Sequence, residues 1–424
     1  MALADKNEER KSFMSTQISL PVEGTQNLKK VEKETSAAAV RTGVMAAGRM
    51  LFVDNLRVFL TILVVVFHLA ITYGAEGSWF YRERPTSELA GILLTLFIVW
   101  NQFYFMGLFF LVSGYFVPGS VERKGGWRYI KDRLVRLGIP LVIFSTLLSP
   151  VVEWAKGLNE GYFSGNLVEF FADYWRRGDI ASGPLWFVEI LLAFSVIYVL
   201  GRAILDWLNS RQAKPGAAPV WRKLTHTQIV LFISVLVPLN FIVRLYSPIG
   251  VEWNHIQLAF MPQYALMFTA GILAYRWNWL PDLPAGVRKV WSLIAILAII
   301  ALPMIMVSAG STENFAPFLG GKTYQSLILS GWEAVYCVSM AVLMLSVFRS
   351  RLDFQGSLGR FLSKNAYPVF IIHAPLIVGL AWLLKGISID PLLKFALVSP
   401  MAVGLCFLVS HTLIRRIPLA DKVL

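Results

Sequence analysis

The residue best suited to chemistry in this sequence is a histidine placed inside a long apolar run. His68 lies within LTILVVVFHLAITYG, and Arg57 precedes it by eleven positions. Eleven steps of about 100° leave a net rotation of only about 20°, so Arg57 and His68 share one face of a helix, with Asp54 near that face. Polar groups at membrane depth are costly and are functional candidates by default, although a neutral histidine that ties two helices together is an equally open alternative.

Three more ionisable residues lie inside apolar runs. Glu189, in GPLWFVEILLAF, could orient a histidine or accept a substrate proton, or it could be an interfacial glutamate surrounded by water. Glu333, in LSGWEAVYCV, could act in function or pair with a basic group elsewhere, and His373 ends the string AYPVFIIH. A histidine suits general-base work on a hydroxyl because its reference pKa, about 6.5, lies near the working pH.

Two arginines precede a further apolar run in the string KDRLVRLGIP. Arg133 and Arg136 are three positions apart, which places them on one face of an α-helix. Two guanidinium groups in that arrangement can hold phosphates through bidentate hydrogen bonds. Basic residues beside a span are also what membrane orientation requires, so the pair has a structural alternative. Together with a buried histidine that can act as a base, this phosphate-binding pair favours a donor substrate that carries a nucleotide.

These residues must be held by helices that cross a membrane. Of the 424 residues, 56% are apolar and 15% are charged, whereas a soluble domain carries about 25% charged residues. This composition excludes a disordered protein and a secreted disulfide scaffold, and it argues against a soluble enzyme. Ten apolar runs approach the roughly 20 residues that span a bilayer, and they cover 56–74, 89–117, 137–153, 184–203, 227–246, 257–276, 290–309, 325–348, 366–384 and 392–414. We therefore predict an all-α integral membrane protein with about ten transmembrane helices.

The runs also predict some local features. The second run is long enough to tilt or to break at Gly107, and its small residues Ser113, Gly114 and Gly119 favour close helix packing. The segment 154–183 is the longest loop and is expected to lie on the membrane surface. The two cysteines, Cys337 and Cys406, lie inside apolar runs, so neither a disulfide nor a metal site is expected.

The basic residues predict the orientation of the chain. Thirty Lys and Arg fall in the tails and loops on one side of the ten runs, and seven fall in the loops on the other side. Because basic loops stay in the cytoplasm, both termini are predicted to be cytoplasmic. The net charge of +13 comes from basic residues that membrane orientation explains. No nucleic-acid partner is therefore expected. We expect a mostly disordered cytoplasmic tail over 1–50, a membrane domain over 51–415 and a short cytoplasmic tail over 416–424.

The motifs together resemble the membrane acyltransferase type 3 family. Arg57 and His68 form an R-x10-H pair in DNLRVFLTILVVVFH, and FFLVSGYF follows at 109–116. The Arg133/Arg136 pair is followed by LGIPL, and LWFVEILL and AYPVFIIH fit as well. The resemblance spans residues 54 to about 375. The strings DNLR and FHLAITYG are also similar to a branch that includes bacterial glucan-modifying succinyltransferases.

This resemblance implies a ten-helix enzyme that moves an acyl group, acetyl or succinyl, from a cytoplasmic acyl-coenzyme A. The acceptor would be a hydroxyl of an envelope glycan, sugar or lipid-linked molecule. It implies that His68 is catalytic with Arg57 and Glu189, and that Arg133 and Arg136 handle the donor. Acyl-coenzyme A would be a co-substrate, with no permanently bound cofactor and no metal. The expected location is the bacterial cytoplasmic membrane.

Other interpretations remain open from the residues alone. Many family members carry an extracytoplasmic hydrolase-like domain at the C-terminus, and no such domain is expected here, since the chain continues only ten residues past the last run. A transporter that exports a small acidic or sugar-linked solute is the main alternative, although matched helix breaks in two halves are not found. A scaffold with an inactive site is a weaker one, because His68, Arg57 and the Arg133/Arg136 pair are all present. The acyl group and the acceptor cannot be read from the sequence.

Overall fold

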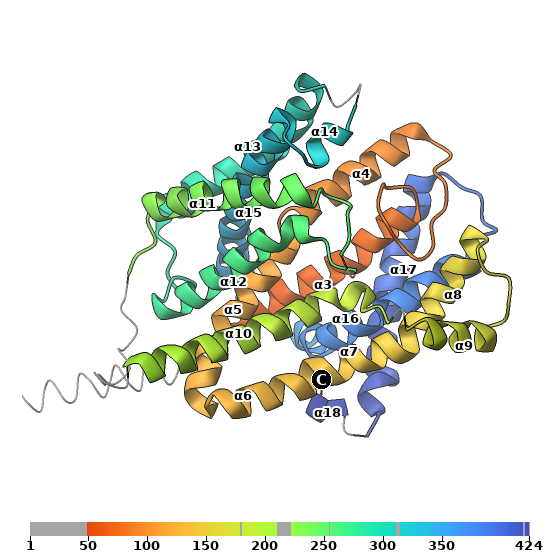
Figure 1. Ribbon diagram of the computed structural model, residues 1–424, viewed down its shortest axis with the longest axis horizontal. Coiled ribbons are helices and arrows are strands. Elements are labelled where there is room, and N and C mark those ends of the chain that lie inside the picture. Colours follow the sequence, from red (N-terminus) through yellow and green to blue (C-terminus); the bar gives the residue numbers. More distant parts are fainter. Residues whose placement is uncertain are drawn as a thin grey trace, which may run out of the picture. The chain divides into compact units, whose positions relative to one another are not determined.

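The computed structural model of the protein describes residues 49–178, 180–209, 222–253, 255–310, 314–418 and 420–423. The predicted N-terminal tail lies outside these residues except for its last two positions. Within the described ranges the chain is helical and contains no β-strand, only an isolated bridge between Trp253 and Ile256. Figure 1 shows how the helices from Leu51 onward are arranged.

Ten segments in the described part of the chain are long and apolar enough to cross a membrane, which confirms the predicted number of spans. They are α3 (Leu51–Thr72), α4 with α5 (Glu88–Gln102, Phe105–Lys124), the segment Gly126–Glu160, η3 with α10 (Gly183–Leu185, Trp186–Asn209), α11 (His226–Tyr246), η5 with α12 (Leu258–Phe260, Met261–Arg276), α13 (Ala285–Ser308), α15 (Tyr324–Arg351), α16 (Ser357–Leu383), and α17 with η6 (Pro391–Thr412, Ile414–Arg416). The short helices α14 (Ala316–Leu319) and α18 (Ala420–Val423) lie between or after these spans.

The second span is broken, but not at the predicted position. Helix α4 ends at Gln102 and α5 begins at Phe105, so Gly107 lies within the first turn of α5. The interruption frees the carbonyl oxygen of Phe103, which accepts a hydrogen bond from Gln263 Nε2 at 3.2 Å. Irregular backbone inside a membrane domain requires such protein partners, because lipid offers none. The break therefore sits where a polar side chain of α12 can satisfy it.

The third span is longer than predicted and contains two π-helical turns. It runs through α6 (Gly126–Arg133), η1 (Leu134–Gly138), α7 (Ile139–Ile143), η2 (Phe144–Leu148) and α8 (Ser149–Glu160). Each π turn ends two positions before a proline, since η1 precedes Pro140 and η2 precedes Pro150. Proline lacks an N–H group and cannot bond the carbonyl four positions back, so a wider turn before it absorbs the mismatch. The hydropathy pattern predicted only the apolar portion, 137–153.

The segment predicted as the longest loop is partly helical. Helix α8 continues to Glu160, and α9 (Leu167–Arg177) begins with a capping box formed by Asn166 and Glu169. The hydroxyl of Tyr174 on α9 donates to the carbonyl of Ser145 at 3.0 Å. Helix α9 is thus fastened to the third span, and its placement on the membrane surface stays a prediction.

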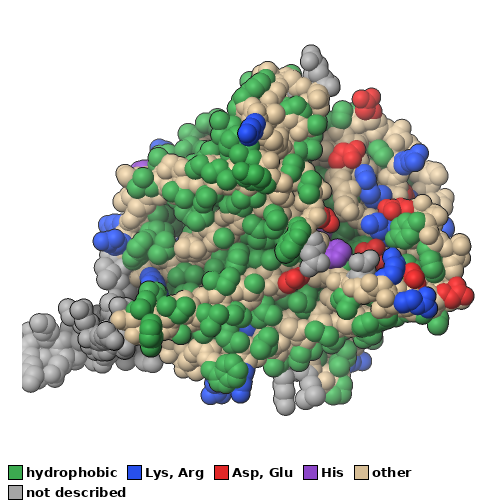
Figure 2. Space-filling model, in the orientation of Figure 1, with side chains coloured by type: hydrophobic (Ala, Val, Ile, Leu, Met, Phe, Trp, Pro, Cys, Tyr) green, Lys and Arg blue, Asp and Glu red, His purple; other side chains and the backbone are tan. Residues whose placement is uncertain are grey.

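The ten spans differ greatly in burial. Within the most apolar stretch of each span, the share of buried residues is 67% in α3, 67% in α15 and 61% in α16, but only 22% in α11 and 22% in α13. Figure 2 shows that hydrophobic side chains cover most of the middle of the viewed face, while acidic and basic side chains gather toward its right-hand end. The polar candidates His68, Glu333 and His373 lie on the three well-buried helices.

The small residues of α5 allow close packing, as predicted. A Cβ atom added at Gly114 would lie 2.2 Å from the carbonyl oxygen of Phe268 on α12. The reverse contact is as tight, since a Cβ at Gly271 of α12 would lie 2.0 Å from the carbonyl oxygen of Leu111. Glycine at both positions therefore lets the two backbones touch, which is a recurrent way for membrane helices to associate.

Candidate active site

Two histidines from different helices face each other inside the bundle. His68 of α3 and His373 of α16 have ring centroids 5.2 Å apart. The indole of Trp79, from the segment that follows α3, lies over His68 with the ring centroids 3.9 Å apart, and 6.3 Å from the ring of His373. His373 is completely buried, whereas His68 is partly accessible. The bundle therefore joins two predicted candidates into one cluster with an aromatic cover.

Backbone hydrogen bonds determine which nitrogen of each imidazole carries the proton. Nδ1 of His68 lies 2.8 Å from the carbonyl oxygen of Val64, and Nδ1 of His373 lies 2.7 Å from that of Phe370. A carbonyl oxygen can only accept, so Nδ1–H is the donor in both rings, and a neutral imidazole then carries a lone pair on Nε2. Within the described residues, the Nε2 atom of His373 and the indole N–H of Trp79 are buried without a hydrogen-bond partner. The cluster thus offers a base and a donor to a substrate.

Aromatic side chains form the walls around this cluster. Phe67 contacts His68 edge to face at 5.4 Å and stacks on Phe105 of α5 at 5.2 Å between ring centroids. Phe370 lies 5.8 Å from His373. These rings give the two imidazoles a largely apolar surrounding. Sequence reasoning missed Trp79, because a residue in a loop carries no periodic signal that would place it over a helix.

Arg57 and Asp54 lie on α3 as predicted, but at a distance from the histidines. The guanidinium of Arg57 is 3.9 Å from the carboxylate of Asp54 and lies over the ring of Phe116, 4.6 Å from its centroid. Eleven residues of helix separate Arg57 from His68, about 16 Å along the axis. The shared helix face therefore holds these two groups well apart along the helix axis.

Glu189 lies in the first turn of α10 and is half-buried. Its carboxylate makes no hydrogen bond or ion pair with another described residue. The neighbouring Phe187 packs on Phe370 with ring centroids 5.8 Å apart, which brings this turn of α10 toward α16. The carbonyl of Val64, rather than Glu189, orients the imidazole of His68. A role for Glu189 with the acceptor stays a prediction.

The Arg133/Arg136 pair does not sit on a plain α-helix. Arg133 is the last residue of α6 and Arg136 lies in the π turn η1, so the i, i+3 geometry assumed from the sequence does not apply directly. The guanidinium of Arg133 lies 5.0 Å from the centroid of the Tyr129 ring. The hydroxyl of Tyr367 on α16 donates to the carbonyl oxygen of Arg136 at 2.6 Å. This bond ties the arginine segment to the helix that carries His373.

Glu333 pairs with a basic residue, which is one of the two roles considered for it. Its carboxylate forms an ion pair with Arg244 of α11, and both side chains are fully buried. Arg244 also donates to the hydroxyl of Ser330 at 3.1 Å. The sequence placed Arg244 at the end of a span and gave no reason to single it out. The ion pair connects α11 to α15 and neither partner contacts the histidine cluster through a hydrogen bond.

Comparisons with known proteins agree with this architecture. The family model described as acyltransferase domain, of acyltransferase type 3, matches residues 50–411. The chain is 24% identical over 395 residues to glucans biosynthesis protein C of Salmonella paratyphi B, Salmonella agona and Salmonella dublin, which covers 88% of this chain and 94% of each relative. No solved structure matches the chain. Because the family match covers most of the chain and includes both histidines, this protein belongs to the acyltransferase type 3 family and is a membrane acyltransferase.

Proposed function

We propose that the protein is an O-acyltransferase that moves an acetyl or succinyl group from cytoplasmic acyl-coenzyme A to a hydroxyl of an envelope glycan. A free sugar or a lipid-linked sugar would present the same hydroxyl. Family membership supports the reaction class, and the name of the Salmonella relatives supports a glucan as acceptor. The ten apolar helices and the bacterial source of these relatives support a place in the bacterial cytoplasmic membrane, with both termini cytoplasmic as the basic residues predict.

The observation that carries the proposal is the 2.8 Å contact between Nδ1 of His68 and the carbonyl oxygen of Val64, which leaves Nε2 as a proton acceptor. An alcohol is a weak nucleophile, so Nε2 takes the hydroxyl proton as the oxygen attacks the thioester carbonyl. The carbon–sulfur bond then breaks, and the imidazolium returns the proton to the leaving thiolate of coenzyme A. The products are an ester and a free thiol, and the base is regenerated. A transient acyl-imidazole is the alternative to direct transfer.

The neighbouring groups support this step. The indole N–H of Trp79 is an unpartnered donor beside His68, and it can bond the carbonyl oxygen as negative charge develops there. His373 forms the other wall of the cluster. The carbonyl of Val64 holds the productive tautomer of His68 and stabilises the imidazolium that forms.

The donor would enter from the side of Arg133 and Arg136. Guanidinium groups bind phosphates with directed hydrogen bonds, and coenzyme A carries its phosphates far from the thioester. The flexible pantetheine arm can then reach inward, while the acceptor approaches from the opposite end of α3. Arg57, at the N-terminal end of α3, could hold a donor phosphate on the way.

The test is the stoichiometry of purified protein reconstituted in liposomes. Acetyl- or succinyl-coenzyme A is supplied with a glucan oligosaccharide, and free thiol and sugar ester are measured together. The proposal predicts acceptor-dependent thiol release with one ester formed for each thiol. Movement of solute across the liposome membrane without thioester consumption would instead identify a transporter.

A further inference from the structure

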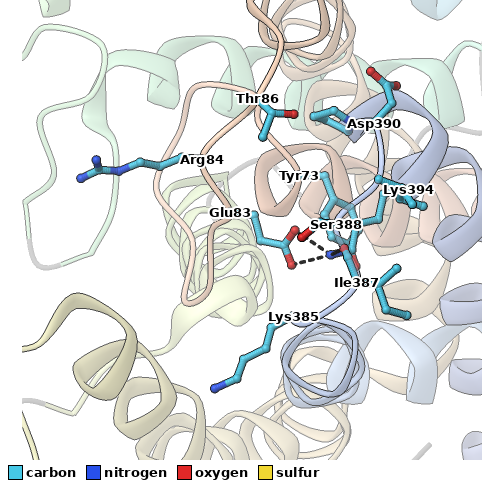
Figure 3. A pocket seen from close by; sticks show the side chains of 11 residues that line it. Tyr73, Glu83, Arg84, Thr86, Lys385, Ile387, Ser388, Asp390 and Lys394 are labelled. Atoms are coloured by element: carbon cyan, nitrogen blue, oxygen red, sulfur yellow. Dashed lines mark hydrogen bonds and ion pairs between the residues drawn. The ribbon is translucent and has the colours of Figure 1, made fainter.

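A polar cavity of about 350 Å³ lies beyond the C-terminal end of α3. It is lined by the segment that follows α3 and by the loop and first turn that begin α17, as Figure 3 shows. This volume falls at the small end of the range for small-molecule sites, roughly 300–1,000 Å³. The same segment after α3 carries Trp79, the residue that covers His68. The cavity is therefore connected to the histidine cluster through one short stretch of chain.

Tyr73 is the lining residue nearest to the histidines along the chain. Its backbone N–H donates to the carbonyl of Leu69, which continues the α3 pattern, so Tyr73 follows His68 by about 7.5 Å along the axis. The side chain is 1% exposed, and its hydroxyl has no hydrogen-bond partner among the described residues. Burial, and after it the nearby Glu83 carboxylate, raises the pKa of Tyr73 well above its ordinary value, so the phenol keeps its proton. Buried hydroxyls nearly always have a partner, so this one is available to hydrogen-bond a molecule in the cavity.

The cations at the cavity wall are already engaged or directed elsewhere. Lys394 is buried and donates to both carboxylate oxygens of Glu83, at 2.9 and 2.8 Å, and to the carbonyl of Ile387 at 2.9 Å. These three bonds use every proton of its ammonium group. Lys385 lies over the Trp382 ring, 4.6 Å from its centroid. Figure 3 shows Arg84 extending away from the other labelled side chains.

The remaining groups suit a neutral molecule with several hydroxyls. Asp390 caps α17 through Oδ1, which accepts from the N–H groups of Leu392 and Leu393 and leaves Oδ2 for another donor. Thr86 and Ser388 add hydroxyls that both donate and accept. A phosphate or a carboxylate would require cations directed into the cavity, whereas Lys394 is paired with Glu83, Lys385 lies over the Trp382 ring and Arg84 extends away. Carboxylate acceptors beside hydroxyl groups match the alternating donors and acceptors of a sugar.

We propose that this cavity binds a sugar unit of the acyl acceptor. That the bound molecule is the acyl acceptor rests on the proposed function. That it is a sugar rests on the groups that line the cavity. Binding would supply Tyr73 with its missing partner and would bring the acceptor against the segment that carries Trp79. The Glu83–Lys394 ion pair fixes that segment to α17 and so shapes the cavity without binding the sugar directly.

The experiment measures binding of a glucose pentasaccharide to the full-length protein in lipid nanodiscs by calorimetry, without any thioester. Three proteins are compared: wild type, Tyr73→Phe, and the matched control Tyr324→Phe, which removes a phenol hydroxyl that is exposed at the start of α15. Loss of one neutral hydrogen bond should raise the Kd of Tyr73→Phe about three- to tenfold. The control should keep the wild-type Kd. Because the Tyr73 hydroxyl has no protein partner, the thermal stability of Tyr73→Phe should not fall.

A second variant and a second probe make the outcome decisive. Asp390→Asn keeps a side chain that caps helices well, and it should also weaken pentasaccharide binding at least about threefold, because a charged acceptor is lost. Equal Kd values for wild type and both variants, no binding to wild type, or displacement of the sugar by inorganic phosphate would each overturn the proposal. Normal acyl transfer with unchanged sugar binding in Tyr73→Phe would refute the sugar site in this cavity and keep the proposed acyltransferase function. Weakened sugar binding in Tyr73→Phe, together with a wild-type protein that transfers no acyl group, would support the sugar site and refute the acyltransferase function.

Discussion

Helices α3 and α13 show that hydrophobicity and burial are separate properties in this protein. Helix α13 is the most apolar of the ten spans, yet 22% of its most apolar stretch is buried, against 67% for α3. Lipid is as apolar as leucine, so an apolar helix gains little by moving from lipid to the interior of a bundle. A helix that carries a histidine at depth gains much, because neighbouring helices can satisfy its polar group. The central position of α3 thus follows from His68 and from close packing rather than from hydropathy.

The largest effect predicted from this comparison concerns His68. Replacing His68 by alanine removes the proposed general base, so the rate of acyl transfer should fall about 10²- to 10⁴-fold. Expression and binding of acyl-coenzyme A should stay near normal. The matched control is His411→Ala at the end of α17, which should keep the wild-type rate. A His68→Ala rate close to that of the control would return His68 to a role in helix packing.

The next largest effect concerns the ion pair between the buried α15 and the peripheral α11. Glu333→Ala leaves the buried guanidinium of Arg244 without its partner, which should lower the free energy of unfolding by about 3–5 kcal/mol. The double variant Glu333→Met, Arg244→Met removes both charges and should recover most of that loss. Denaturant unfolding in mixed micelles measures both. Equal losses of unfolding free energy in the single and double variants would mean that the attraction within the pair stabilises the fold. The cost of an isolated buried charge would then not be the main effect.

A smaller effect is expected for the arginines before the third span. Each charge-assisted contact contributes about 1.5–3 kcal/mol, so Arg133→Ala, Arg136→Ala should weaken acyl-coenzyme A binding tenfold or more. The variant Arg128→Ala, Lys131→Ala removes the same charge from the preceding turns of the same span and serves as the control. Similar losses in both variants would show that general positive charge, rather than this pair, attracts the donor.

The smallest effect is predicted for the outer surface of α13. Leu293 is 56% exposed on α13 and Leu60 is fully buried on α3. Leu60→Ala should cost about 2–5 kcal/mol of unfolding free energy, because it leaves a cavity. Leu293→Ala should stay within about 0.5 kcal/mol of wild type. Comparable losses at the two positions would contradict the division into buried and peripheral spans.

The sequence predicted the spans well, because each needs only a long apolar run. The exact ends were less predictable. The break between α4 and α5 depends on Gln263, which reaches the Phe103 carbonyl from a helix distant in sequence. The extended third span depends on π turns before two prolines, which hydropathy does not detect.

The candidate site was predicted in part. His68 and His373 were chosen because polar residues at depth are rare, and the fold brings them to 5.2 Å between ring centroids. Their pairing could not be predicted, since periodicity gives the face of one helix and not its neighbour. Trp79 and Arg244 were missed for the same reason, because their importance lies in contacts across the bundle. The i, i+3 geometry of Arg133 and Arg136 assumed a regular α-helix, whereas Arg136 lies in a π turn that the sequence pattern did not indicate.

The central claim is that this chain acylates an envelope glycan through His68. It is tested most directly by mass spectrometry of envelope glycans and lipids from three strains: one with the wild-type protein, one without it, and one with His68→Ala at matched abundance. The account predicts an acetyl or succinyl mass on a glycan in the first strain only. An unchanged pattern in the strain without the protein, or full acylation with His68→Ala, would contradict it.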